Sequence, residues 1–509
     1  MRAPAKRQHL GQRQAVASGL FLDFNSVLGI ANVAIALILL WQNQMDISSV
    51  YTDQWTVLLA LVMAGVLHCV LWYERRRRNP LLIIIVVIIL GFFLFRIVTL
   101  NIYSFSEVLS RSGCAPAAVN SAFCFIITAT VALCLGIGAA ARPGRIVLPL
   151  GQQRVGGVHR VIAFLFLSLL VMYLVDADSF WLISIIRSFF NQNLVLGVVI
   201  TYLLATPHSL RTKSIVWSLV ALEGVLHLLG GSRGSLYTIA VCYLCAHLAM
   251  FNRLQWTRSQ ALVTVTLVVL AFPIALVAFH QATSIRGSKT AATITLQDSS
   301  DIALESALRI GGIDFEDKVK PILDRLGFFD FSIDLIVNRE RYKGVVTVTA
   351  HVKSIVDNLL TPGFDIFDQP RISNSLRNAY AGGELKKSQV AESYHTDQLG
   401  VFGELYVLFG YFGIVVIFTM GYAIQRAYQH DAGGSRLVLA IRRYTIITIF
   451  YNLINSYGVD WVVIDGVVLI VSVMITERFV LRDFHQPRVN LFDRPRQDRI
   501  GYSRSCIQT

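Results

Sequence analysis

The sequence predicts an all-α polytopic membrane protein with about 12 transmembrane helices and one large, mainly helical loop outside the cytoplasm. Three observations predict this class. The chain is 54% hydrophobic and only 15% charged, with a mean hydropathy of +0.58, a profile typical of polytopic membrane proteins and not of soluble enzymes. Apolar segments long enough to cross a bilayer recur along the chain. The short connections between them alternate between basic and non-basic.

The apolar segments predict the order of parts along the chain. We place spans at residues 23–41, 55–73, 81–100, 119–140, 161–176, 190–206, 214–229, 235–251, 261–279, 400–425, 437–455 and 461–480. Residues 1–279 therefore hold membrane helices 1 to 9, and residues 280–399 form the large loop. Residues 400–480 hold helices 10 to 12, and residues 481–509 form a cytoplasmic tail.

The net charge of +13 follows from topology and does not indicate a nucleic-acid partner. Acidic residues balance basic ones within residues 280–399, so the excess lies in the termini and in short turns such as the run from Arg75 to Arg78. Basic residues beside membrane spans favour the cytoplasmic side, which places both termini there. The first 14 residues are basic but lack a short apolar core with a cleavage site. The first span is thus expected to act as an uncleaved anchor.

The large loop has helical signals of its own. Ser299 or Ser300 is expected to cap a first helix, with an amphipathic pattern through Ile302, Leu304, Leu308 and Ile310. A second helix is expected around residues 345–360, ended by Pro362-Gly363. A further helix is expected to begin near Ser388 and to continue without a break into the tenth span.

The turn Gly230-Gly231-Ser232-Arg233-Gly234 joins the seventh and eighth spans with almost no free loop. The basic flanks Lys213 and Arg253 leave room for two crossings of about 20 residues each and little else. Arg233 is therefore expected at the outer membrane face. An arginine in that position is costly unless an anionic group meets it.

Other cationic candidates gather on the same predicted side: Arg286 beyond the ninth span, and Arg371 and Arg377 in the loop. Several arginines near one membrane face suit a phosphate or pyrophosphate headgroup through bidentate hydrogen bonds. The alternative is that the loop arginines are solvated or paired with nearby carboxylates.

Two residues are candidates for proton transfer. His395 precedes the tenth span, and a histidine can take a proton from an attacking sugar hydroxyl near neutral pH. Glu404 opens the same apolar span, where it can act as a second base, an arginine partner or an interface carboxylate. Glu223 and His227 share one helix face and are expected to pair with each other or with Arg96, in a structural role.

No sequence pattern indicates a cofactor or a metal ion. Asp176-Ala-Asp178 is an isolated D-x-D pair, and Cys242-x-x-Cys245 lacks the second pair that a zinc site requires. There is no nucleotide-binding loop and no zinc-ligand cluster in the sequence pattern.

Two segments resemble one family. Gly-Ser-Arg-Gly-Ser-Leu at residues 231–236 resembles the arginine turn of bacterial O-antigen polymerases of the Wzy type. Gly-Glu-Leu-Tyr-Val-Leu-Phe-Gly-Tyr-Phe-Gly at residues 403–413 resembles the helix after that family's large periplasmic loop. The order of parts is also similar. Arg371 with Gly382 fits an arginine–glycine spacing noted in some polymerase loops.

This resemblance implies a metal-independent glycosyltransferase of the bacterial inner membrane. It would polymerise undecaprenyl-pyrophosphate-linked oligosaccharide units of a surface polysaccharide on the periplasmic side, with a chain-length regulator protein as a further partner. Arg233, Arg286, Arg371 and Arg377 would bind the pyrophosphate, and His395, Glu404 and Arg233 would be catalytic.

Two alternatives stay open. O-antigen ligases have a similar architecture, but His395 lies further from the following glycines than the histidine of their motif does. A transporter or flippase for lipid-linked sugars would place charged residues near the bilayer midplane, whereas the candidates here gather at one face.

Overall fold

A computed structural model describes the chain in fourteen segments. These are residues 22–77, 79–103, 106–141, 158–174, 192–205, 209–229, 235–251, 255–256, 328–360, 366–373, 375–376, 400–430, 436–455 and 458–479. The predicted ninth span, the turn at residues 230–234 and the loop residues 280–327 lie outside this part of the chain.

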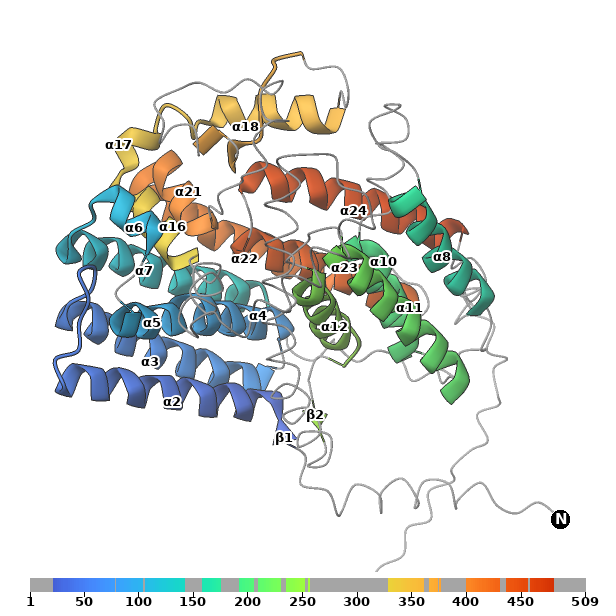
Figure 1. Cartoon of the computed structure of the whole chain (residues 1–509), viewed down its shortest axis with the longest axis horizontal. Coiled ribbons are helices and arrows are strands. Elements are labelled where there is room, and N and C mark those ends of the chain that lie inside the picture. The colour runs from blue at the N-terminus through green and yellow to red at the C-terminus, as the bar shows by residue number, and fades with distance from the viewer. Residues whose placement is uncertain are drawn as a thin grey trace, which may run out of the picture.

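The described elements are helical apart from one pair of two-residue strands (Figure 1). The first group is β1 (Leu22–Asp23), α2 (Phe24–Gln44), α3 (Gln54–Arg77), α4 (Pro80–Ile88), the π-helix η1 (Ile89–Leu94), α5 (Phe95–Tyr103), α6 (Glu107–Ser112) and α7 (Pro116–Ala140). The second is α8 (Val158–Leu174), α10 (Gln192–Ala205), α11 (Leu210–Leu229), α12 (Ser235–Phe251) and β2 (Gln255–Trp256), which pairs antiparallel with β1.

The remaining elements come from the predicted loop and the last three spans. They are α16 (Phe328–Val337), α17 (Arg339–Tyr342), α18 (Val348–Ile355), the π-helix η4 (Val356–Leu360), α21 (Val401–Phe409), the short 3₁₀ helix η5 (Gly410–Phe412), α22 (Gly413–Gln429), α23 (Arg436–Ile454) and α24 (Val459–Phe479). The predicted loop helix at residues 345–360 corresponds to α18 and η4.

Seven of the described helical stretches are long and apolar enough to cross a membrane, which confirms the membrane class. They are α2, α3, the α4–η1–α5 stretch, α7, the α21–α22 stretch, α23 and α24, and they overlap seven of the predicted spans. The predicted fifth to eighth spans correspond to α8, α10, α11 and α12, which are shorter or less apolar. The total of about twelve spans stays a prediction.

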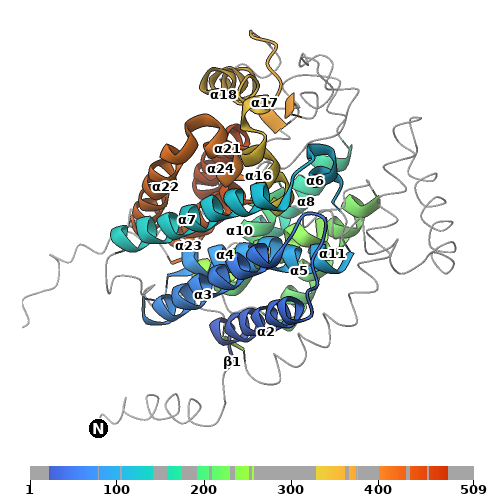
Figure 2. The same cartoon turned by 90° about the vertical axis from the view of Figure 1, so that its left-hand side faces the viewer.

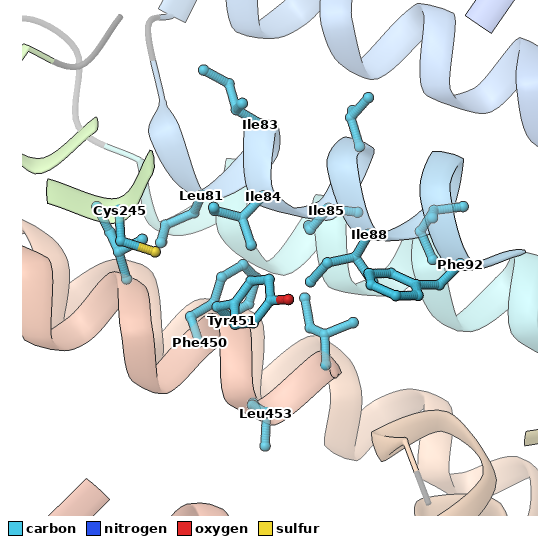
Figure 3. Packing of buried hydrophobic residues seen from close by; sticks show 14 of the residues in the cluster. Leu81, Ile83, Ile84, Ile85, Ile88, Phe92, Cys245, Phe450, Tyr451 and Leu453 are labelled. Atoms are coloured by element: carbon cyan, nitrogen blue, oxygen red, sulfur yellow. The ribbon is translucent and has the colours of Figure 1, made fainter. Parts of the chain in front are cut away.

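The third span lies at the centre of the bundle. Pro80 occupies its first turn, where no amide hydrogen is needed, and the Asn79 side chain accepts a hydrogen bond from the Leu81 amide at 3.2 Å. The following Leu/Ile/Val run is apolar on all sides, which suits a helix surrounded by other helices. Its side chains pack against Phe450 and Tyr451 of α23 (Figure 3).

One helix of the predicted loop is inserted among the membrane helices. Phe328, Phe329 and Asp330 of α16 are buried, and the Phe328 ring packs edge-on against Phe92 at a centroid distance of 4.7 Å. The Arg96 guanidinium donates to the Asp330 carboxylate, with Nη2 2.6 Å and Nε 3.0 Å from Oδ2. Arg96 therefore has a carboxylate partner from the predicted loop, and the expected pairing of Glu223 and His227 with each other or with Arg96 stays a prediction.

The α21–α22 stretch, the predicted tenth span, starts after one glycine and is interrupted at another. Gly400 has φ +63° and Gly410 has φ +59°, backbone conformations that glycine tolerates best. The helix therefore begins at Val401, and the expected unbroken helix from Ser388 is wrong at Gly400. The described parts of the predicted loop, residues 328–360, 366–373 and 375–376, pack at the end of the bundle where α21 and α24 begin, which we call the loop end (Figure 1).

Helices α7 and α22 lie side by side and cross at two glycines (Figure 2). A Cβ atom added at Gly136 would lie 2.1 Å from the carbonyl oxygen of Phe418. One added at Gly421 would lie 2.7 Å from the carbonyl oxygen of Leu133. Small residues at such a crossing let two membrane helices approach backbone to backbone.

Gly136→Ala is expected to destabilise the α7–α22 crossing by about 1–3 kcal/mol, because backbone atoms of α22 have to move. Gly138→Ala is the matched control, since its Cβ would contact the Tyr73 side chain at ordinary distances of 3.5 Å and more. Thermal unfolding in detergent measures both variants. Equal unfolding temperatures for Gly136→Ala and Gly138→Ala would contradict the crossing.

Candidate functional site

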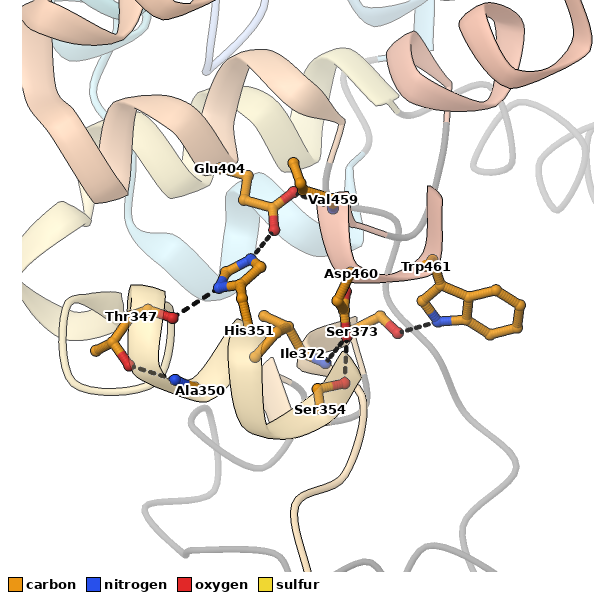
Figure 4. Close-up of polar contacts among 10 residues, drawn as sticks. All are labelled: Thr347, Ala350, His351, Ser354, Ile372, Ser373, Glu404, Val459, Asp460 and Trp461. Atoms are coloured by element: carbon orange, nitrogen blue, oxygen red, sulfur yellow. Dashed lines mark hydrogen bonds and ion pairs between the residues drawn. The ribbon is translucent and has the colours of Figure 1, made fainter. Parts of the chain in front are cut away.

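A buried polar cluster lies at the loop end, where α18, α21 and α24 meet (Figure 4). Its first member is Glu404, in the first turn of α21, with no exposed surface. One carboxylate oxygen, Oε1, contacts Nε2 of His351. The other, Oε2, accepts a hydrogen bond from the Val459 amide at 2.8 Å. Glu404 thus connects the tenth span to a loop helix and to the start of the last span.

His351 comes from the loop helix α18. Thr347 caps that helix, its hydroxyl accepting from the Ala350 amide at 3.0 Å, and this fixes where the first turn begins. Nδ1 of His351 lies 2.7 Å from the Thr347 carbonyl oxygen. Burial lowers the pKa of His351, but the hydrogen bond and charge of Glu404 outweigh it and raise that pKa to about 9. The raised pKa favours a proton on the imidazole, so His351 and Glu404 share a proton across this buried contact.

Asp460 is the third member, at the start of α24. Its Oδ2 accepts from the Ser354 hydroxyl at 2.7 Å and from the Ile372 amide at 3.1 Å. The side chain is completely buried, and Oδ1 has no hydrogen-bond partner among the described residues. A buried carboxylate oxygen without a partner is energetically unfavourable and points to a ligand or to a group outside these residues.

Arg371 is the fourth member. Its guanidinium stacks on the Trp461 ring, 3.6 Å from the ring centroid, and the Trp461 indole donates to the Ser373 hydroxyl at 3.0 Å. Burial lowers the pKa of Arg371, while the charges of Asp465 and Asp460 oppose that shift. Its buried Nη1 has no hydrogen-bond partner within the described part of the chain. We call His351, Arg371, Glu404 and Asp460 the loop-end cluster.

The structure brings two of the sequence-predicted site residues to one place. Arg371 and Glu404 both lie beside Asp460, although they come from the loop and from the tenth span. The other predicted site residues lie outside the described residues: Arg233, Arg286, Arg377 and His395. The Asp176–Asp178 pair also lies outside them.

His351 and Asp460 are members of the loop-end cluster that were not predicted from the sequence. Asp465 falls in the predicted last span and Asp460 directly precedes it, and acidic residues in or beside a membrane span indicate a functional site by default. That signal was sufficient to select them. His351 has no comparable signal, because a single histidine in an amphipathic helix is common.

Comparison with protein-family models, with curated proteins and with solved structures finds no match to this chain. The fold and the cluster define a helical membrane protein with a buried, charged site at the end where its largest predicted loop packs.

Proposed function

We propose that this protein is a glycosyltransferase of the bacterial inner membrane that polymerises undecaprenyl-pyrophosphate-linked oligosaccharide repeat units on the periplasmic side. One observation supports this most. Arg371 and Glu404, predicted separately for pyrophosphate binding and for catalysis, meet at the start of α24 beside apolar membrane helices. A lipid-linked substrate needs a binding site for its charged pyrophosphate next to the bilayer that holds its lipid tail.

In this proposal Arg371 binds the pyrophosphate of the donor. The Trp461 ring holds its guanidinium flat, and its Nη1 is available as a donor among the described contacts. A planar guanidinium binds phosphate oxygens in pairs and stabilises the charge that develops on the leaving group. Arg233, Arg286 and Arg377 are further pyrophosphate ligands in the proposal. Because arginines carry that charge, the transfer step needs no metal ion.

The transfer step forms one bond and breaks one. An acceptor hydroxyl oxygen attacks the anomeric carbon of the donor sugar, the bond from that carbon to the phosphate oxygen breaks, and undecaprenyl pyrophosphate leaves. Both oxygens of Glu404 are engaged, by His351 and by Val459. We therefore assign Glu404 a positioning role and leave the acceptance of the hydroxyl proton to His395.

The length of surface polysaccharide chains in a strain lacking this protein tests the proposal. Single repeat units on the acceptor lipid are expected. Complete loss of surface sugar would instead indicate a flippase or a ligase, and unchanged chain lengths would contradict all three functions.

Arg371→Lys is expected to reduce long polysaccharide chains by roughly 10²-fold, because lysine keeps the charge but loses the paired hydrogen bonds. Chain-length profiles of strains producing each variant at equal protein levels measure the effect. Lys343→Gln is the control, since Lys343 lies exposed in a loose 3.8 Å pair with Glu340. A normal profile for Arg371→Lys would remove Arg371 from the mechanism.

A further inference from the structure

We propose that His351, Glu404 and Asp460 bind one divalent transition-metal ion of the zinc type, which fastens the outer loop to the membrane helices. This ion goes beyond the proposed transfer reaction. Its role is structural. In the transfer reaction, the arginines still stabilise the charge that develops on the leaving group.

The three side chains provide the geometry. One ligand atom from each, a ring nitrogen and two carboxylate oxygens, can be chosen so that all lie within 4.8 Å of one another. All three residues are buried, and they come from α18, α21 and α24 (Figure 4). Ligand atoms around a tetrahedral zinc ion lie about 3.3 Å apart, given bonds of about 2.0–2.1 Å. Binding an ion therefore requires the Asp460 carboxylate to come closer to the other two ligands and the His351–Glu404 contact to open.

The orientation of His351 favours a cation. A carbonyl oxygen can only accept, so Nδ1 must donate its hydrogen to the Thr347 carbonyl. Nε2 then faces Oε1 of Glu404, and without a proton on Nε2 both atoms are acceptors. Two acceptors in contact need a shared positive particle, either a proton or a metal ion. A histidine that donates from one nitrogen to a backbone carbonyl is the usual arrangement of a metal ligand.

Asp460 supplies the second, independent observation. Its Oδ1 is completely buried and has no hydrogen-bond partner among the described residues. Its other oxygen is held by Ser354 and by the Ile372 amide, and Glu404 is held by the Val459 amide. Such contacts orient the carboxylates that ligate metal ions.

The donor set selects the class of ion. One imidazole with two carboxylates suits Zn²⁺ and similar first-row ions, whereas Mg²⁺ and Ca²⁺ prefer oxygen ligands alone. A divalent ion would also balance the charge of the two buried carboxylates. It would displace the proton between His351 and Glu404, as metal binding to histidine generally does.

Metal content tests this proposal. Full-length protein in detergent is stripped with a chelator, equilibrated with Zn²⁺ alone and desalted. We expect the wild type to retain about one zinc ion per chain and to unfold about 3 °C higher than the stripped protein. His351→Gln and Asp460→Asn should lose both effects, and asparagine still accepts the hydrogen bonds of Ser354 and Ile372. His430→Gln, at the exposed end of α22, is the matched control.

Wild-type protein that retains no more zinc than His351→Gln would overturn the site, as would equal loss in His430→Gln. The visible spectrum of Co²⁺ added to stripped wild-type protein provides a second test, which requires no variant. A visible spectrum distinct from aqueous Co²⁺ and abolished by Zn²⁺ is expected, and an unchanged aqueous spectrum would overturn the proposal. Neither measurement involves glycan transfer, so failure here leaves the proposed function standing, and the reverse also holds.

Discussion

Asp330→Ala is expected to lower the free energy of unfolding by about 3–5 kcal/mol, because it leaves the Arg96 guanidinium buried without its carboxylate. Both side chains are only 2% exposed. Asp330 also accepts a hydrogen bond from the Ser106 hydroxyl at 2.6 Å, so a second buried donor loses its acceptor. The lost interactions are those that hold α16 in the bundle beside η1 and α7.

Chemical or thermal unfolding in detergent measures this loss. Glu340→Ala is the control, since Glu340 pairs with Lys343 at 3.8 Å on an exposed surface, where ion pairs contribute about 0–1 kcal/mol. Replacing Arg96 and Asp330 together by apolar residues of similar size should recover much of the loss, because no buried charge remains. Equal stability of Asp330→Ala and Glu340→Ala would mean that α16 is not inserted among the membrane helices.

Glu404→Ala is expected to release the loop end from the membrane helices and to abolish polymerisation. The substitution removes the acceptor of the Val459 amide and the partner of His351 at once. The Val459 amide and the His351 imidazole then stay buried without an acceptor. This loss costs about 1–3 kcal/mol for the amide and more for a charged imidazole. Arg371 should then shift with the loop, because its neighbour Ile372 is anchored on Asp460.

Limited proteolysis of the loop, together with polysaccharide chain length, measures this effect. Glu404→Gln keeps an oxygen for the Val459 amide and should show an intermediate loss. Glu477→Gln is the control, because Glu477 pairs with Arg442 at the far end of α24, at 2.7 Å. A loop that is equally protected in Glu404→Ala and in wild type would refute the positioning role.

Much of the membrane fold could be predicted from the sequence, because apolar length and periodicity are local properties. The third span shows this well. Its Asn-Pro start and its uninterrupted Leu/Ile/Val run specify a buried helix without reference to any other segment. The non-helical backbone at Gly400 was not predicted, since the sequence around a single glycine does not reveal a positive φ.

The loop's place could not be predicted, because its contacts join residues far apart in the chain. Arg96 and Asp330 are separated by 234 residues, and nothing near either one indicates the other. The same limit applies to the loop-end cluster. Glu404 and Arg371 were selected singly, but their shared neighbour Asp460 emerges only when α24 is placed beside the loop.

The most direct test of the proposed function uses purified protein in vesicles with undecaprenyl-pyrophosphate-linked repeat units isolated from a strain that lacks this protein. We predict a ladder of products that differ by whole repeat units, with release of undecaprenyl pyrophosphate, and no ladder with Arg371→Ala. Movement of unextended units across the bilayer, or their transfer to a different acceptor without elongation, would contradict a polymerase.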